Sequence, residues 1–466
     1  MDILNKSKKI TFFWIAFCLF QFNGIAQNSI LNKYINQAIE SNSVLKQKQL
    51  SYEKSLLTLK EAKQMFYPTV SFVAQYEYNY GGRTINMPFA DMLNPVYQNL
   101  DVINQFNSTI PSYPNIPNYP QIENVETQLN PKEQQRTQVE FEMPIYNKAL
   151  FLNKKLQKQL SEISKITADS YKKELIKQVK SAYLDYNIAL QTVAVGDKAL
   201  ALVKSSLAVT NSLYKNDKVT IDEVYSAKAK LKDIENQILE INKGVVLTKA
   251  YFNFLLNKKY NDSIELDTDF SKEYLLEDVK SLIAIALNNR DEIKLLDLAL
   301  QIDETNIKME KSAFLPLFYL NGSTGFWSDD YKFNDDTYFA SISISAKWDI
   351  FTGGQTKNKI KQAKIDKSIT TEKKKDLENN ISLEVAEAFY NVKTAKESLE
   401  LSKLELENYK ESLKIIEKKK INNLATQLEY DIAFTEYFEA EINFLTNKNK
   451  YFQKIIELEF ITNKNI

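Results

Sequence analysis

The amino-acid sequence lacks the side chains on which most enzymes and metalloproteins depend. Its 466 residues include no histidine and a single cysteine, Cys18. Cys–His and Ser–His catalysis and most zinc sites are therefore excluded. Neither a phosphate-binding loop nor the glycine pattern of a dinucleotide-binding fold is present. We therefore expect no enzymatic activity, no cofactor and no bound metal.

Glycine, proline and net charge are also scarce. There are 9 glycines and 10 prolines, and the 60 basic residues balance the 60 acidic ones. A neutral balance gives no support to nucleic-acid binding. Long stretches without glycine or proline favour unusually long helices, and the clearest is 147–215, which has Gly196 as its one glycine.

Long hydrophobic runs are missing as well. Residues 10–20 form an apolar run of about eleven residues, shorter than the roughly 20 that a spanning helix needs. The run follows a lysine-rich start and precedes a small-residue cleavage site at Gly24-Ile25-Ala26. We expect residues 1–26 to be a secretory signal peptide whose cleavage removes Cys18. A mature chain without a spanning helix can cross a membrane only as strands of a closed barrel.

What the sequence does contain is an internal repeat. Residues 34–80 and 282–328 align without a gap at a separation of 248 positions. In each copy an amphipathic helical pattern stops at a proline and gives way to alternating apolar and polar residues. Such a repeat constrains the architecture more than any single motif. The matched pairs include Ala38 with Ala286, Leu45 with Ile293, Lys46 with Lys294, Leu50 with Leu298, Phe66 with Phe314 and Pro68 with Pro316.

A second repeated unit follows in each half. Residues 178–184 match residues 384–390 at a separation of 206 positions. Beyond the next helix break, the best hydrophobic match drops to a separation of about 203, which pairs Ile221 with Leu424. Each half is therefore predicted to contain, in this order, a helix, two strands, a very long helix, a break and a final helix.

This order sets the predicted domain boundaries. The first repeat covers residues 27–256, the second covers 282–466, and a connector at 257–281 joins them. After an initial helix, the first repeat is predicted to contain a strand at 69–80, a loop at 81–135, a strand at 136–146 and helices at 147–215 and 219–256. After its own initial helix, the second is predicted to contain a strand at 317–325, a loop at 326–336, a strand at 337–351 and helices at 356–418 and 424–460.

The four strand segments alternate apolar and polar residues, most clearly at 341–350. Segments of about ten residues with this alternation are typical of membrane β-barrels, although a soluble sheet with one buried face gives the same pattern. Clustered aromatic residues favour the membrane because they prefer its boundary with water. The candidate membrane-interface aromatics are Tyr76, Tyr78, Tyr80, Trp327 and Trp348.

Four strands cannot close a barrel with a wide lumen, so closure requires several copies of the chain, and three copies would supply twelve strands. Residues 81–135, with seven prolines and many asparagines, are predicted to be a long loop. Long external loops are usual in outer-membrane barrels, so we expect this one outside the cell.

The predicted helix lengths match within each half. Residues 147–215 would form a helix roughly 100 Å long, and those at 34–67 and 219–256 together would reach about 108 Å. Two short helices stacked end to end can therefore pair with one long helix. Two unrelated helical bundles are the alternative explanation. The same match holds in the second half for 282–315, 356–418 and 424–460.

The duplicated units ending at Pro68 and Pro316, together with the segment from Tyr214 to Leu231, resemble the TolC-like outer-membrane efflux protein family. The resemblance implies a mainly α-helical, duplicated fold in which helical hairpins form a periplasmic tunnel. Four strands per chain would form a trimeric, twelve-stranded barrel in the outer membrane. The resemblance also implies a homotrimer in outer-membrane lipid that docks with a periplasmic adaptor protein and an inner-membrane pump. Such a duct passively conducts substrates from the periplasm to the cell exterior.

The resemblance points to the ends of the two hairpins as the periplasmic aperture. Where the family pattern has a glycine, this sequence has Asp217 in the first hairpin and Lys420 in the second. Solvated charged turns explain the same residues equally well. A secreted coiled-coil structural protein or adhesin is the alternative function, and the alternation at 341–350 speaks against it. The candidate aperture residues are Asp217, Asp222, Glu417 and Lys420.

Overall fold

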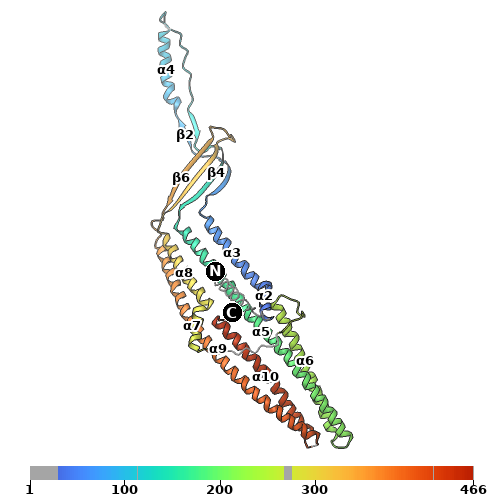
Figure 1. Ribbon diagram of the computed structural model, residues 1–466. Coiled ribbons are helices and arrows are strands. Elements are labelled where there is room, and N and C mark those ends of the chain that lie inside the picture. Colours follow the sequence, from blue (N-terminus) through green and yellow to red (C-terminus); the bar gives the residue numbers. More distant parts are fainter. Residues whose placement is uncertain (1–29, 113, 267–274, 423, 465–466) are drawn as a thin grey trace, which may run out of the picture. The chain divides into compact units, whose positions relative to one another are not determined.

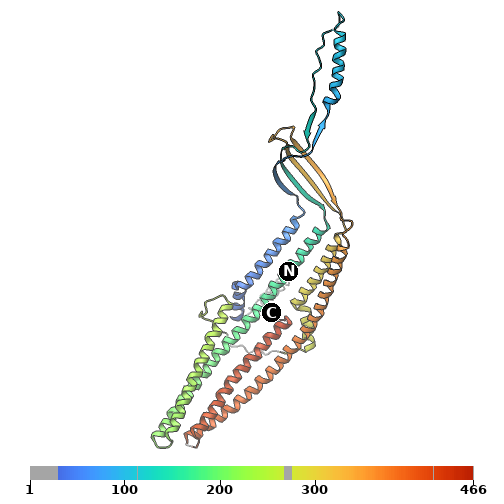
Figure 2. The same ribbon diagram turned by 180° about the vertical axis from the view of Figure 1, so that it is seen from behind.

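The computed structural model describes residues 30–464 except 113, 267–274 and 423. The predicted signal peptide and Cys18 lie outside the described residues. The chain divides into two compact units (Figures 1 and 2), which we call the helical unit and the sheet unit. The sheet unit comprises Lys60–Lys154 and Lys308–Ile360, and the helical unit comprises the rest of the described residues.

The sheet unit contains a four-stranded antiparallel sheet in the order β1-β4-β5-β6. Each repeat supplies one neighbouring pair, and β4 and β5 join the two repeats. β1 and β6 are the edges of the sheet within the described part of a single chain. The expected four strands are present, although β6 ends before position 348 rather than at 351. The strands are β1 (Thr69–Tyr78), β4 (Glu133–Tyr146), β5 (Leu317–Ser328) and β6 (Tyr338–Lys347).

The sheet is apolar on one face and polar on the other because side chains alternate along each strand. Val70 and Phe72 on β1 and Ile342 and Ile344 on β6 share the apolar face, and each is 67–72% exposed. In a soluble antiparallel sheet the apolar face packs on the core of the same chain. Here that face is open, so it requires an apolar environment from outside the single chain.

The predicted loop at 81–135 is a folded insert. Its composition was misleading because most of the prolines avoid the helix: Pro88 is the N-cap, Pro95 lies inside the helix, and the others follow it. The end of the predicted loop, from Glu133, belongs to β4. β2 and β3 pair antiparallel at the base of the insert. The insert consists of β2 (Thr84–Met87), α4 (Phe89–Asn107) and β3 (Val125–Gln128).

The helices outside the insert form two copies of one set. The long helices α5 and α9 have 68 and 67 residues, as the scarcity of glycine and proline predicts. Within the described residues, no helix combines the length and the apolar character needed to cross a membrane. The first copy comprises α2 (Ile30–Ser41), α3 (Ser43–Gln64), α5 (Lys148–Lys215) and α6 (Ile221–Leu255). The second comprises α7 (Val279–Asn289), α8 (Asp291–Ser312), α9 (Gln355–Ile421) and α10 (Gln427–Thr462).

Each predicted helix before a strand is in fact two helices. α2 ends before Asn42, whose side-chain Oδ1 accepts the amide N–H groups of Val44 and Leu45 at 3.0 Å and so caps α3. α7 ends before Arg290, which has an extended backbone. Asn42 and Arg290 are 248 positions apart, so the break itself is repeated. Apolar periodicity missed it because only one residue in each copy leaves the helix.

The buried positions are also repeated, which confirms the internal duplication. A third hydrophobic cluster, which includes Leu184, Ile234 and Phe434, joins α5, α6 and α10. The core of the first copy contains Tyr34, Ala38, Leu175, Val179 and Phe252. At the counterpart positions, the core of the second contains Leu282, Ala286, Ile381, Val385 and Leu458.

The separation of 206 positions holds to the end of each repeat, and the predicted drop to about 203 is wrong. Thr220 and Thr426 are the N-caps of α6 and α10. Asn257 and Asn463, which follow the same helices, have left-handed φ angles of 54° and 53°. A shift of three residues is nearly one helical turn, so an apolar stripe matches almost as well at either separation. The caps match at 206 only.

Candidate functional site

The turn between α5 and α6 contains Asp217, which has a left-handed φ of 57°. The amide of Asp217 donates to Tyr214 O at 3.0 Å, and that of Lys218 donates to Leu213 O at 2.9 Å. These two bonds satisfy carbonyl groups that a helix end leaves free, and the geometry suits glycine or aspartate at the left-handed position. Asp217 is exposed here, and so is Asp222 in the first turn of α6.

Lys420 does not occupy the matching turn position in the second hairpin. It lies in the last turn of α9. Beyond it, the amide of Leu424 donates to Lys419 O at 2.8 Å, which is the counterpart, 206 positions on, of the bond that follows Asp217. The residue equivalent to Asp217 is therefore at position 423, outside the described residues. The incorrect separation of 203 had placed Lys420 there.

Lys420 is instead buried, with 4% of its surface exposed. Its Nζ donates to Ser206 Oγ on α5 at 2.6 Å and to Gln427 Oε1 on α10. The same Nζ lies 4.2 Å from the centre of the Tyr430 ring, in the geometry of a cation–π contact. Burial lowers the pKa of Lys420 to about 8, although the nearby carboxylates of Asp431 and Glu223 act in the opposite direction.

Gln427 connects this lysine to the other helices. Its Oε1 also accepts from Thr210 Oγ1 on α5 at 2.7 Å, and its Nε2 donates to Asp431 Oδ1 at 2.7 Å. Ser226 on α6 donates to Asp431 Oδ2 at 3.2 Å. Burial raises the pKa of Asp431, against the hydrogen bonds from Gln427 and Ser226. A polar network thus links α5, α6, α9 and α10, and we call these residues with Lys420 and Ser206 the lysine network.

An open cavity of about 210 Å³ lies beside the network and is lined by Ser206, Glu417, Lys420 and Tyr430, among others. Burial raises the pKa of the Glu417 carboxyl. Burial also raises the pKa of Tyr430, and the Glu417 carboxylate adds to the effect. The packed state holds the charge of Lys420 with few water contacts. Because the cavity is open to water, separating the helices here would hydrate that charge. Such a network can stabilise one arrangement of the hairpin ends over another.

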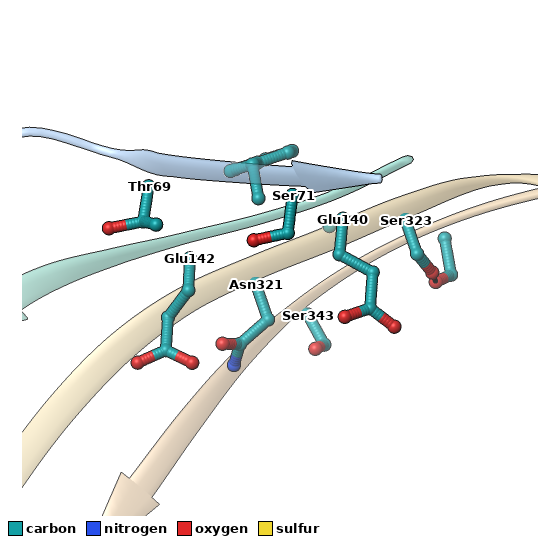
Figure 3. A pocket seen from close by; sticks show the side chains of 10 residues that line it. Thr69, Ser71, Glu140, Glu142, Asn321, Ser323 and Ser343 are labelled. Carbon is teal, nitrogen blue, oxygen red and sulfur yellow. Dashed lines mark hydrogen bonds between the residues drawn. The ribbon is translucent and has the colours of Figure 1, made fainter. Parts of the chain in front are cut away.

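The polar face of the sheet in the sheet unit forms a second candidate site. An open cavity of about 470 Å³ lies over it. Glu140 and Glu142 on β4 project into it beside hydroxyl and amide groups from the other three strands (Figure 3). The register places these side chains in cross-strand rows. The labelled polar lining is Thr69, Ser71, Glu140, Glu142, Asn321, Ser323 and Ser343.

Aromatic side chains gather near the two ends of the sheet. At the end that carries the insert, Tyr76 lies 5.9 Å from Tyr331 and Phe326 lies 5.4 Å from Phe333, measured between ring centres. At the other end, Trp348 follows the last residue of β6, and its Nε1 donates to Phe314 O at 3.0 Å. The apolar face thus has aromatic residues at both ends.

Three solved structures share this fold over most of the chain. A membrane protein from Pseudomonas aeruginosa superposes with a TM-score of 0.74 at 16% identity, over 94% of this chain and 93% of that one. The CmeC outer membrane channel of Campylobacter jejuni gives 0.73 at 15% identity, over 93% and 85%. The open state of the MtrE outer membrane channel of Neisseria gonorrhoeae gives 0.72 at 15%, over 93% and 89%. At these identities the likeness establishes the fold. No curated protein matches the chain.

The sequence of the second repeat matches a known family model. The model is described as outer membrane efflux protein, and it covers residues 282–464. The predicted resemblance to TolC-like efflux proteins is confirmed. The first repeat has the same helix order and buried positions as the second, and the predicted mainly α-helical, duplicated fold with four strands is confirmed over both.

The fold brings two of the four candidate aperture residues together. Glu417 and Lys420 line one cavity, whereas Asp217 and Asp222 are exposed and belong to neither that lining nor the lysine network. Ser206, Gln427 and Asp431 were not predicted as site residues from the sequence. A readable signal did exist nearby, because Thr426 and Glu429 form a capping box that fixes the start of α10.

The candidate membrane-interface aromatics differ in their placement on the sheet. Tyr76 and Tyr78 lie on the apolar face of β1 and are 52% and 56% exposed. Tyr80 lies beyond the end of β1. Trp327 is four residues along β5 from Ser323 and shares the polar face, so the register does not place it with the apolar band.

In the part of the chain that the structure describes, no group of three or more His, Cys, Asp or Glu side chains is arranged to hold a metal ion. The lysine network and the polar face are the two candidate sites among the described residues.

Proposed function

We propose that this protein is the exit duct of a tripartite export system, in which three copies form a channel from the periplasm through the outer membrane. The family of the second repeat and the fold of both repeats support this function. The observation that carries it is the four-stranded sheet, which has two free edges and an exposed apolar face.

The strand order permits closure by copies of the same chain. Neighbours in the order β1-β4-β5-β6 are all antiparallel, so β1 and β6 also run in opposite directions. The β6 edge of one copy can therefore pair with the β1 edge of the next. Two copies would give eight strands, whose interior side chains fill, whereas three give twelve and leave room for a water-filled path.

The two faces of the sheet fit the two environments of such a barrel. The apolar face, with Val70, Phe72, Ile342 and Ile344, would face lipid. The aromatic residues near both ends of this face would lie at the two membrane–water boundaries. The polar face with Glu140 would then line the lumen.

The remaining parts of the proposal follow from the helices and the leader. Residues 1–26 would direct the chain across the inner membrane, and the hairpins would extend into the periplasm. The hairpin ends, including Asp217, Asp222, Glu417 and Lys420, would form the periplasmic aperture and dock with an adaptor protein and an inner-membrane pump. The pump would supply the energy, because the chain contains no nucleotide-binding motif.

Disulfide cross-linking of the two edges tests the closure directly. In a Cys18→Ser background the chain has no cysteine. Ser71→Cys on β1 is combined, one at a time, with Ser341→Cys, Ser343→Cys or Ser345→Cys on β6, because the register between copies is to be determined. We expect at least one combination to give covalent dimers and trimers in outer-membrane fractions.

The control combines Ser71→Cys with Ser323→Cys on β5, which is a central strand and should give no link between chains. A protein that stays monomeric and dissolved in buffer after removal of the leader would contradict the duct. That outcome would favour the secreted coiled-coil scaffold instead.

A further inference from the structure

The helix of the insert, α4, carries an apolar stripe that its own chain does not cover. The stripe consists of Phe89, Leu93, Val96, Leu100 and Ile103. None of the residues of α4 is buried. Four members of the stripe are 37–52% exposed, and Met92 and Phe106 beside it are 66% and 74% exposed. An uncovered row of large apolar side chains marks an interaction surface.

The chain that returns from α4 to β3 covers a different side of the helix. Asn94 Nδ2 donates to Ile122 O at 2.8 Å, and the amide of Ile122 donates back to Asn94 Oδ1 at 2.9 Å. The Tyr97 and Tyr119 rings stack with centres 5.3 Å apart. The intramolecular contacts of α4 thus use its polar side, and the returning chain leaves the stripe open.

The spacing of the stripe indicates what covers it. Its members follow one another at intervals of four, three, four and three residues. This is the alternation of core positions in a coiled coil, in which a helix packs against copies of itself. Pro95 removes a backbone hydrogen bond inside α4, so packing of this stripe would also stabilise the helix.

The charge of α4 argues against a lipid surface as the occupant. Helices that lie on membranes carry lysine and arginine along their polar side. α4 has neither, and its only charged residues are Asp91 and Asp101. Asp101 accepts the amide of Tyr119 at 2.9 Å, and Asp91 accepts from Asn124 at 3.1 Å. The stripe itself is uncharged, so copies can approach one another without repulsion.

We propose that the α4 helices of three copies pack stripe against stripe as a parallel bundle at the outer end of the duct. This inference rests on the proposed trimer, in which β2 and β3 tether each α4 to an end of β1 and β4 and so bring three stripes around one axis. The occupant of the stripe is a second and third copy of this chain. The stripes fill the core of this bundle, so it caps the outer end of the duct, and substrates leave between the β2–β3 tethers beneath it.

Single cysteines on α4 test the bundle in the assembled protein. In the Cys18→Ser background, Val96→Cys places a thiol in the stripe, and Gln98→Cys places one on the opposite, exposed side of the same helix. We expect a short bifunctional maleimide to link Val96→Cys chains into covalent dimers but not Gln98→Cys chains. A bulky, membrane-impermeant maleimide should label Val96→Cys at least ten-fold more slowly than Gln98→Cys on intact cells.

Recovery of an unheated trimer on gels shows that each variant has folded, and Leu100→Cys repeats the test at a second stripe position. If the trimer is present but Val96→Cys and Leu100→Cys label as fast as Gln98→Cys and give no link, the bundle is wrong and the duct stands. Links from the stripe to another protein would overturn the assignment of the occupant. If the parent protein forms no trimer, both proposals fail.

Discussion

The ammonium group of Lys420 on α9 donates a hydrogen bond of 2.6 Å to the hydroxyl of Ser206 on α5, 214 positions earlier in the chain. This bond joins the ends of the two hairpins. Because Lys420 is buried with neutral acceptors around its Nζ, its charge is costly in the packed arrangement. The relationship makes the hairpin ends sensitive to pH.

We expect the packed hairpin ends to gain stability as the pH rises from about 8 to 10.5. The pKa of Lys420 is about 8 when buried and 10.5 when the side chain is free in water. Between these values the opened state binds a proton that the packed state has lost, so raising the pH favours the packed state, by at most about 3 kcal/mol. In planar bilayers the open probability should fall over this range.

The variant Lys420→Met should lose this pH dependence. Lys414→Met is the matched control, because Lys414 is an exposed lysine on the same helix that pairs with Glu411. The control should keep the profile of the unmodified protein. An identical profile for Lys420→Met would show that the lysine network does not govern opening.

Substitutions of Asp217 distinguish the effect of its charge on ion selectivity from the effect of its backbone conformation on stability. Asn and Gly both tolerate its left-handed backbone, so Asp217→Asn and Asp217→Gly should leave the melting temperature nearly unchanged. Asp217→Val should cost about 1–3 kcal/mol, since a branched side chain is strained there. If Asp217 lines the aperture, the first two variants lower cation preference equally. Unchanged reversal potentials in salt gradients would mark it as a solvated turn residue.

Two neighbouring residues of β6 test which face of the sheet meets lipid. Ile342 belongs to the apolar face, and Ser343 belongs to the polar face. Ile342→Lys should reduce assembly in the outer membrane, because a lysine facing the middle of the bilayer costs about 2–4 kcal/mol. Ser343→Lys should assemble normally. The amount of unheated trimer in membrane fractions measures both, and equal yields would argue against the assigned faces.

The carboxylates of the polar face predict ion selectivity. Glu140 and Glu142 project into the cavity over the sheet, and three copies would place six carboxylates around the lumen. The double variant Glu140→Gln and Glu142→Gln should lower the permeability of cations relative to anions, measured as a reversal potential. Glu407→Gln, an exposed carboxylate on α9, is the control. A double variant with the selectivity of the control would place the ion path elsewhere.

The parts of the fold that were predictable are those set by local pattern. Pro68 in the first repeat and Pro316 in the second directly precede β1 and β5. The alternation of apolar and polar residues around Ile342 predicts β6. The helix α4 was hidden because its segment was judged by proline content, although Phe89 to Ile103 has a helical spacing of apolar residues. Composition averages over a segment, whereas a helix depends on where each proline lies.

The lysine network was not predictable from local pattern. Its members Ser206, Lys420 and Gln427 come from three helices, and a buried lysine has the same sequence signature as an exposed one. Thr210 on α5 is buried, at 1% exposure, and its hydroxyl donates to Gln427. Spacing predicts burial, whereas pairing depends on helices that meet only in the folded chain.

In the proposed duct, copies of this chain close a membrane barrel by pairing β1 of one copy with β6 of the next. The most direct test is the electrophoretic size of the protein extracted from outer membranes and run without heating, after oxidation of the Ser71→Cys and β6 cysteine pairs. We predict a band of three chains that resists detergent, becomes covalent for one β6 position and conducts ions in planar bilayers. A single-chain band for every pair, from protein recovered in the aqueous fraction, would contradict the account.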